Sequence, residues 1–136
     1  MLDRLLKSVL IRTVPGRNLE LSVALVGEKK IRELNRDYLS KDEVTDVLAF
    51  PLMTPEELAV LPTEGGGSPE PLGDIVICLP RAVEQATQRG ISELEEVQLL
   101  AVHGFLHLIG FSDESDEDSD RMAEMETELL GRDIIS

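Results

Sequence analysis

The sequence predicts an α+β fold in which a small mixed β-sheet is covered by helices. Its 136 residues, 42% of them apolar, are enough for one compact domain with one hydrophobic core. Segments with strand periodicity are interspersed with segments of helical periodicity, in the order α-β-α-β-β-α-α-α. No segment repeats and nothing indicates a second domain, so residues 1–136 are expected to form a single domain.

The N-terminal part is expected to contain two helices and two strands. Apolar residues at helical spacing predict a helix over residues 1–14. Apolar and polar side chains then alternate over residues 19–25, as in a strand with one buried face. Helical spacing returns over residues 31–38. Residues 44–50 are rich in β-branched side chains and precede Pro51, which predicts a second strand.

The middle of the chain is expected to contain a long loop, a central strand and a helix. Residues 54–71 are rich in proline, glycine and glutamate, so an exposed loop is predicted there. Residues 73–79 are apolar on both faces, which is typical of a strand in the middle of its sheet. A helix is then expected to begin at Pro80 and to end at Gly90.

Two further helices are expected at the C-terminal end. Ser92 and Glu95 have the spacing of a capping box, which predicts the start of a long helix. Gly110 is expected to end this helix in a left-handed turn. The acidic residues 113–120 then precede the last helix, whose start they favour through the helix dipole. The residues of this helix expected to face inward are Met122, Met125, Leu129 and Leu130.

Composition restricts the cellular compartment and the partners. The lone cysteine, Cys78, cannot form an internal disulfide, and the N-terminus lacks the features of a secretory signal, so a reducing cytoplasm is expected. The most apolar stretch, residues 97–111, is too short to cross a membrane. A net charge of −14 disfavours nucleic-acid partners, yet basic residues in one groove can still attract RNA because whole-chain charge is not local potential.

The only two histidines predict a metal site. His103 and His107 are four residues apart, so on a helix both imidazoles project from the same face toward one ion. Asp113, just beyond the predicted turn, is the best placed third ligand, with Glu114 or Asp116 as alternatives. Two histidines and a carboxylate are a ligand set of hydrolytic Zn²⁺, and the carboxylate also suits nickel, cobalt or manganese.

A second interpretation is that both histidines belong to the core and hydrogen-bond to backbone. A pair at the spacing that metal sites use favours the metal site. The residue after the first histidine, Gly104, disfavours a peptidase, because metalloproteases of the His-Glu-x-x-His type have their general base there. This glycine allows either the close approach of another chain or substrate, or close packing.

Three motifs, in the order found in this chain, resemble the bacterial YbeY family of rRNA maturation factors, which are metal-dependent endoribonucleases. Residues 103–113 read HGFLHLIGFSD, where the family has HGxLHLxGYDH. Residues 34–51 contain Leu-Asn and, further on, TDVLAFP, close to the family's TDVLSFP. Residues 72–78 read LGDIVIC, close to the family's LGDI strand. The resemblance spans most of the chain.

The resemblance also identifies departures from the family. The family's third metal histidine falls on Asp113 and its preceding aspartate on Ser112. The family arginine falls on Leu39, which removes a guanidinium suited to stabilising charge on phosphate oxygens. Arg36 and Lys41 are the candidate catalytic residues that could replace it, and both are also consistent with solvated surface charges.

The resemblance implies a cytoplasmic endoribonuclease that cuts single-stranded RNA during ribosomal RNA maturation and quality control. Its expected cofactor is one divalent metal, with Zn²⁺ first, and its expected partners are ribosomal RNA and the small ribosomal subunit or its proteins. No membrane and no DNA partner is expected. Three other functions stay open: a non-catalytic ribosome-assembly factor with a structural metal, a metal-dependent hydrolase of another substrate, and a peptidase, which is the weakest because the helix lacks the glutamate.

Overall fold

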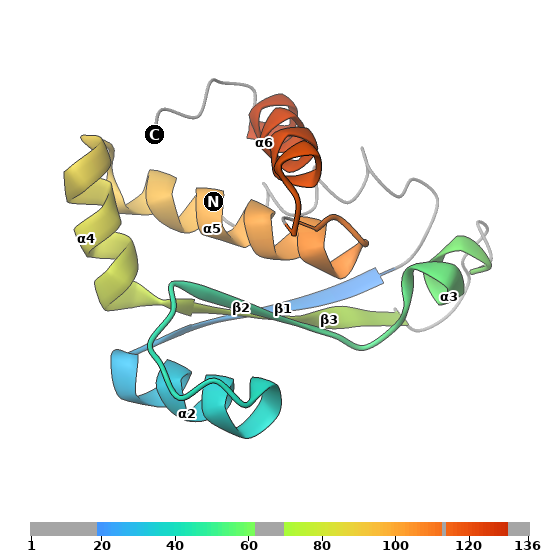
Figure 1. The fold of residues 1–136 in the computed structure, drawn as a ribbon, viewed down its shortest axis with the longest axis horizontal. Helices are drawn as coiled ribbons and strands as arrows, with labels where there is room; N and C mark the ends of the chain where they lie inside the picture. The colour runs from blue at the N-terminus through green and yellow to red at the C-terminus, as the bar shows by residue number, and fades with distance from the viewer. Residues whose placement is uncertain (1–18, 62–69, 113, 131–136) are drawn as a thin grey trace.

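The computed structural model describes residues 19–61, 70–112 and 114–130, which form a sheet between two layers of helices (Figure 1). The predicted helix over residues 1–14 and the predicted ligand Asp113 lie outside the described residues. The elements are β1 (Leu19–Val26), α2 (Glu28–Leu39), β2 (Val47–Pro51), α3 (Pro55–Ala59), β3 (Glu70–Cys78), α4 (Leu79–Arg89), α5 (Glu93–Leu108) and α6 (Asp116–Leu130).

The sheet is small and mixed, as predicted. Its strand order is β1-β3-β2, with β1 parallel and β2 antiparallel to β3. The central strand is β3, and its apolar residues serve two cores, because successive side chains point to opposite faces. Ile75 and Ile77 belong to the larger core, whereas Val76 and Cys78 pack with Ile31 of α2. The predicted α+β fold with a central third strand is therefore confirmed.

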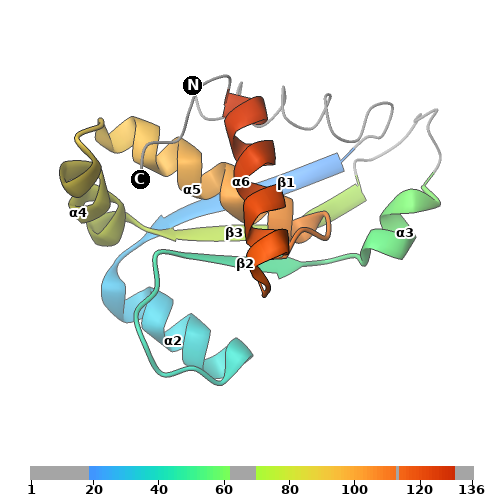
Figure 2. The ribbon, with the colours of Figure 1, turned by 45° about the horizontal axis from the view of Figure 1, so that its top comes forward.

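Helices cover both faces of this sheet. In Figure 1, α2 lies below the sheet, and α4, α5 and α6 lie above it. The view in Figure 2 shows α6 crossing α5 at the end of α5 that carries the two histidines. Because α5 is packed between the sheet and α6, it is apolar on most sides, and ten of its sixteen residues are buried. No helix within the described ranges is both long enough and apolar enough to span a membrane.

Gly104 permits α5 to approach the sheet closely. A Cβ atom at this position would lie 2.9 Å from Cγ2 of Ile75 on β3 and 3.4 Å from Cγ2 of Val47 on β2. Packing against the sheet therefore explains the glycine, in preference to the approach of a substrate. The helix ends as predicted, with Gly110 at a φ of +107° in the turn that follows.

The segment between α2 and β2 is fixed at both ends. The buried side chain of Asn35 donates from Nδ2 to the carbonyl oxygen of Glu43, at 3.0 Å. At the other end, the backbone N–H of Cys78 donates to the carbonyl oxygen of Asp46, at 2.8 Å. These bonds hold the connecting segment against the sheet, so that Lys41 and Asp46 are presented beside α5.

Three predicted boundaries and one predicted loop were wrong. The predicted loop 54–71 contains α3, which begins with a capping box formed by Thr54 and Glu57, and it also contains the start of β3 at Glu70. Strand β2 begins at residue 47 instead of 44, because the preceding residues belong to the connecting segment. The acidic run extends into α6, which begins at Asp116, so its aspartates form the first turns of the helix.

Candidate metal centre

The two histidines of α5 face each other across one helical turn. Nε2 of His107 lies 3.2 Å from Nε2 of His103. The ring centroids are 4.7 Å apart and the ring planes are inclined at 79°. Both side chains are partly exposed although most of their neighbours on α5 are buried. The structure therefore brings the two predicted ligands together, with Nε2 of one ring facing Nε2 of the other.

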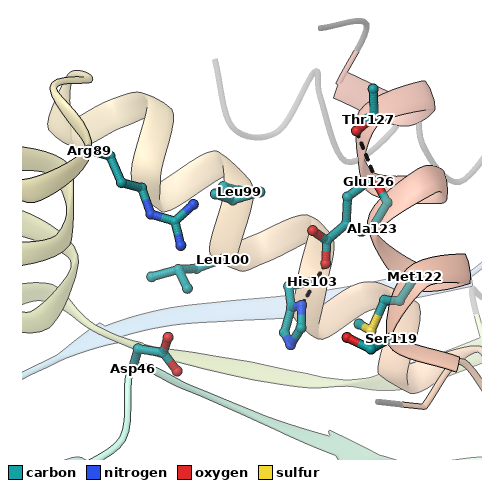
Figure 3. A pocket seen from close by; sticks show the side chains of 10 residues that line it. All are labelled: Asp46, Arg89, Leu99, Leu100, His103, Ser119, Met122, Ala123, Glu126 and Thr127. Carbon is teal, nitrogen blue, oxygen red and sulfur yellow. Dashed lines mark hydrogen bonds and ion pairs between the residues drawn. The ribbon is translucent and has the colours of Figure 1, made fainter. Parts of the chain in front are cut away.

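A carboxylate from α6 orients the imidazole of His103. Nδ1 of His103 donates to Oε1 of Glu126 at 2.6 Å (Figure 3). The bond fixes the tautomer whose proton is on Nδ1, so Nε2 of His103 carries the lone pair. In metalloproteins, a carboxylate commonly holds a metal-binding histidine in this way. Glu126 is buried, and it was not among the residues predicted for the site.

The nitrogen separation fits a tetrahedral metal ion. Two nitrogens bound at about 2.05 Å to a tetrahedral Zn²⁺ are about 3.3 Å from each other. The observed 3.2 Å between Nε2 of His103 and Nε2 of His107 is close to this value. Within residues 19–61, 70–112 and 114–130, no third histidine, cysteine or carboxylate completes the group. The predicted third ligand, Asp113, lies outside those ranges and stays a prediction.

His103 lines an open cleft of about 330 Å³ between α5, α6 and the segment that precedes β2. Figure 3 shows Asp46 on one side of this cleft, Glu126 on the other, and Arg89 reaching in from α4. The Asp46 carboxylate accepts hydrogen bonds from Nε2 of Gln85, at 3.2 Å, and from its neighbour Thr45. This mixture of apolar walls and a few polar groups is typical of a ligand-binding site.

His107 lines a second cleft, of about 340 Å³, on the side of α5 that faces α2 and β2. Leu39 and Lys41 line this cleft as well, so position 39 shares a cleft with His107. Among the described residues that line it, Lys41 is the single lysine or arginine. Arg36 lines neither of these two clefts; it is exposed and forms an ion pair with Asp37 at 3.1 Å, so its role at the site stays a prediction that this geometry does not favour.

The acidic start of α6 is directed away from the first cleft. Between residues 114 and 120, only Ser119 lines the cleft that contains His103. The carboxylates of Asp116 and Glu117 are exposed, and Ser115 accepts from the backbone N–H of Asp118 at the start of the helix. The run therefore stabilises the beginning of α6, and none of its described carboxylates lines the cleft that contains His103.

A buried carboxylate lies behind the first cleft. Glu96 of α5 has a fully buried side chain whose Oε2 atom is 3.5 Å from Nε of Arg89. Burial raises the pKa of the Glu96 carboxyl; the Arg89 guanidinium opposes this shift and the negative charge of Asp46 adds to it. Neither Glu96 oxygen has a hydrogen-bond partner among the described residues. Arg89, which lines the cleft, and Glu96, which lies behind it, were not among the residues predicted for the site.

The raised pKa of Glu96 predicts how a neutral substitution changes the pH dependence of stability. The pKa of Glu96 is higher in the folded state than in the unfolded state. Its favourable contribution to the free energy of unfolding is therefore complete below about pH 4.5 and is lost as the pH rises through the folded-state pKa. We therefore expect the thermal midpoint of Glu96→Gln, relative to that of the native chain, to increase from pH 4.5 to pH 8. Glu84→Gln, an exposed change on α4, is the control; an equal pH trend in both variants would contradict this expectation.

Known proteins share the sequence and the fold of this chain. The profile of the family described as Endoribonuclease YbeY matches residues 1–132. A protein named Endoribonuclease YbeY from Bacillus cytotoxicus is 44% identical over 114 residues, which cover 82% of this chain and 71% of the relative. A protein of the same name from Geobacillus thermodenitrificans is also 44% identical, over 83% of this chain and 72% of the relative.

A solved structure has the same fold. The solution structure of TM1509 from Thermotoga maritima superposes with a TM-score of 0.60 at 27% identity, and the match covers 96% of this chain and 79% of that protein. The family profile extends over nearly the whole chain, and the relatives share its sequence over more than two thirds of their length. This chain therefore belongs to the YbeY endoribonuclease family.

Proposed function

We propose that this protein is a metal-dependent endoribonuclease that cleaves single-stranded RNA during ribosomal RNA maturation. The observation that carries the proposal is the pair of Nε2 atoms of His103 and His107, 3.2 Å apart at the junction of two clefts. The family supplies the substrate class, since its members are named endoribonucleases. The ribosomal partners and the cytoplasmic location are part of the same proposal.

The metal is proposed to be Zn²⁺, held by His103, His107 and Asp113. Two imidazoles and one carboxylate leave a fourth position open, which is the arrangement of catalytic rather than structural zinc. When bound, the ion supplies a Lewis acid that lowers the pKa of a water molecule and polarises a phosphoryl oxygen. Nickel, cobalt and manganese accept the same donors, so the identity of the metal is decided by measurement.

The protein's own residues position the ligands and the substrate. Glu126 holds the His103 ring through Nδ1, so this ring keeps its orientation when RNA enters the cleft. On the other side of the pair, we propose that the Lys41 ammonium approaches the phosphodiester, because it lies in the same cleft as His107 and Leu39. A lysine there acts as a point charge and lacks the bidentate hydrogen bonding of the family arginine.

Incubation of purified protein with single-stranded ribosomal RNA, with and without a chelator, tests this function. We expect cleavage that stops when the metal is removed and returns when Zn²⁺ is added. Intact RNA in the presence of bound metal would instead support the assembly-factor function, with the metal in a structural role. Cleavage that continues after complete removal of the metal would contradict a metal-dependent mechanism.

Asp113→Ala tests the third ligand separately. We expect this variant to lose most of its affinity for Zn²⁺, since two imidazoles alone leave the ion with too few protein ligands. Bound zinc, measured by mass spectrometry after dialysis, gives the result. Glu114→Ala and Asp116→Ala are the matched controls, because both remove a nearby exposed carboxylate. An unchanged zinc content in Asp113→Ala would remove this residue from the site, and a loss in one of the controls would identify its replacement.

A further inference from the structure

Arg89 is placed to bind an anionic ligand in the first cleft. It belongs to the last turn of α4, and its side chain, 30% exposed, extends into the cleft that contains His103 (Figure 3). Of the described residues that line this cleft, it is the single lysine or arginine. The two carboxylates there already accept hydrogen bonds from other groups: Asp46 from Gln85, and Glu126 from His103.

Glu96 forms an ion pair with this arginine on the side away from the cleft. Its carboxylate is fully buried and lies 3.5 Å from Nε of Arg89. Burial of a carboxylate is unfavourable unless the charge is paired, so its presence here calls for a function. With Nε directed to Glu96, the edge of the guanidinium formed by the two terminal nitrogens is left for another acceptor. No hydrogen bond from those nitrogens occurs within the described part of the chain. Two parallel N–H donors on one edge match the geometry of a phosphate.

The distance from the histidine pair decides which phosphate Arg89 can reach. Glu96 precedes His103 by seven residues on α5, which corresponds to about 10 Å along the helix axis. A stacked nucleic-acid strand rises about 3.4 Å per nucleotide, so this distance corresponds to roughly three nucleotides. This separation lies between two positions on α5, and Arg89 lies at the Glu96 end of it, in the cleft that also contains His103.

We propose that Arg89 binds a backbone phosphate of single-stranded RNA roughly three nucleotides from the bond that is cleaved at His103 and His107. This inference rests on the proposed function and adds a remote binding position to it. An interaction made equally with the substrate and with the transition state lowers KM without raising kcat. Arg89 is therefore a substrate-positioning residue, and it affects only RNA that is long enough to reach it from the histidine pair.

Arg89→Gln tests this proposal, because glutamine keeps a polar side chain with N–H donors but has no charge. With a uridine decamer as substrate, we expect KM to rise about tenfold, the effect of removing one charge-assisted hydrogen bond, and kcat to stay within about twofold. Fluorescence anisotropy with labelled decamer and chelator-treated protein gives the second measurement. The slope of log affinity against log salt concentration should become shallower by about 0.7, as for a single strand bound through one phosphate fewer.

Matched variants and substrates separate binding from structural damage. Arg89→Lys keeps the charge and should restore most of the salt slope, and Arg32→Gln removes an exposed arginine of α2 and should leave KM unchanged. The dinucleotide UpU is too short to reach Arg89, so its cleavage should not respond to Arg89→Gln. Equal losses for the decamer and UpU, or an unchanged salt slope, would overturn the proposal. If the native protein cleaves neither RNA, the nuclease function fails, whereas the anisotropy slope still decides for or against phosphate binding by Arg89.

Discussion

His107→Ala is expected to abolish RNA cleavage while the protein stays folded. The substitution removes one of two Nε2 atoms that are 3.2 Å apart, and it leaves a single imidazole on α5 for the metal. Loss of an outer hydrogen-bond partner already lowers metal affinity about 10- to 100-fold, so loss of a direct ligand should exceed about 100-fold. Because the side chain is partly exposed and lines a cleft, alanine at this position leaves no cavity in the core.

Zinc titration and cleavage of single-stranded RNA check this expectation together. Gln98→Ala is the matched control, since it shortens another partly buried polar side chain of α5 that lines neither the His103 cleft nor the His107 cleft. Circular dichroism of both variants should show the native helix content. Full zinc affinity in His107→Ala would be incompatible with a ligand role for this histidine.

Glu126→Ala is expected to lower zinc affinity about 10- to 100-fold without removing any ligand of the ion. The carboxylate accepts from Nδ1 of His103 at 2.6 Å, so its loss frees the ring to rotate and to take the other tautomer. Glu126→Gln should be affected less, because its amide oxygen can still accept the N–H although the charge is lost. Zinc affinity at fixed pH is the measurement, and RNA cleavage at saturating zinc is the second.

A structural role for Glu126 would give a different result. If Glu126 only stabilised the fold, Glu126→Ala would lower the thermal midpoint of the metal-free protein and leave the zinc affinity of the folded protein unchanged. Glu124→Ala, which removes an exposed carboxylate of the same helix, is the control for net charge and should leave zinc affinity unchanged. If Glu126→Ala and Glu124→Ala bind zinc equally well, the positioning role is wrong.

Much of the fold could be predicted, because its main elements are marked by periodicity and by caps. The capping box of Ser92 and Glu95 is formed as expected, and the alternation from Leu19 onward corresponds to β1. Helix α3 was not predicted, since its five residues are too few to show a helical period, although Thr54 and Glu57 have the spacing of a capping box. Proline at its first turn suggested a loop, but proline is also favourable there.

The candidate site was predictable only in part. The spacing of His103 and His107 was sufficient to predict that the two rings meet, because both residues are on one helix. Helix α5 brings them together independently of the rest of the fold. Glu126 is 23 residues from its partner, and only the packing of α6 on α5 joins them. A signal was present, since Glu126 shares the buried stripe of Met122 and Leu129 at helical spacing, where an unpaired carboxylate would be unfavourable.

Arg89 and Glu96 were missed for a similar reason. A basic residue in the last turn of α4 is usual for a helix end, so Arg89 had an ordinary explanation. Glu96 lies among the acidic residues of the first turn of α5, which are equally usual at a helix start. Only the packing of α4 against α5 shows that one side chain is fully buried and that the other enters the cleft of His103.

Anomalous diffraction at the zinc edge, from crystals of the native protein grown with Zn²⁺, tests most directly whether the two histidines bind one metal ion. We expect a single strong peak about 2.0–2.1 Å from Nε2 of His103 and from Nε2 of His107, with Nδ1 of His103 still bonded to Glu126. A map without a peak between the two rings, or with zinc bound only elsewhere on the protein, would contradict the metal centre and the nuclease mechanism that depends on it.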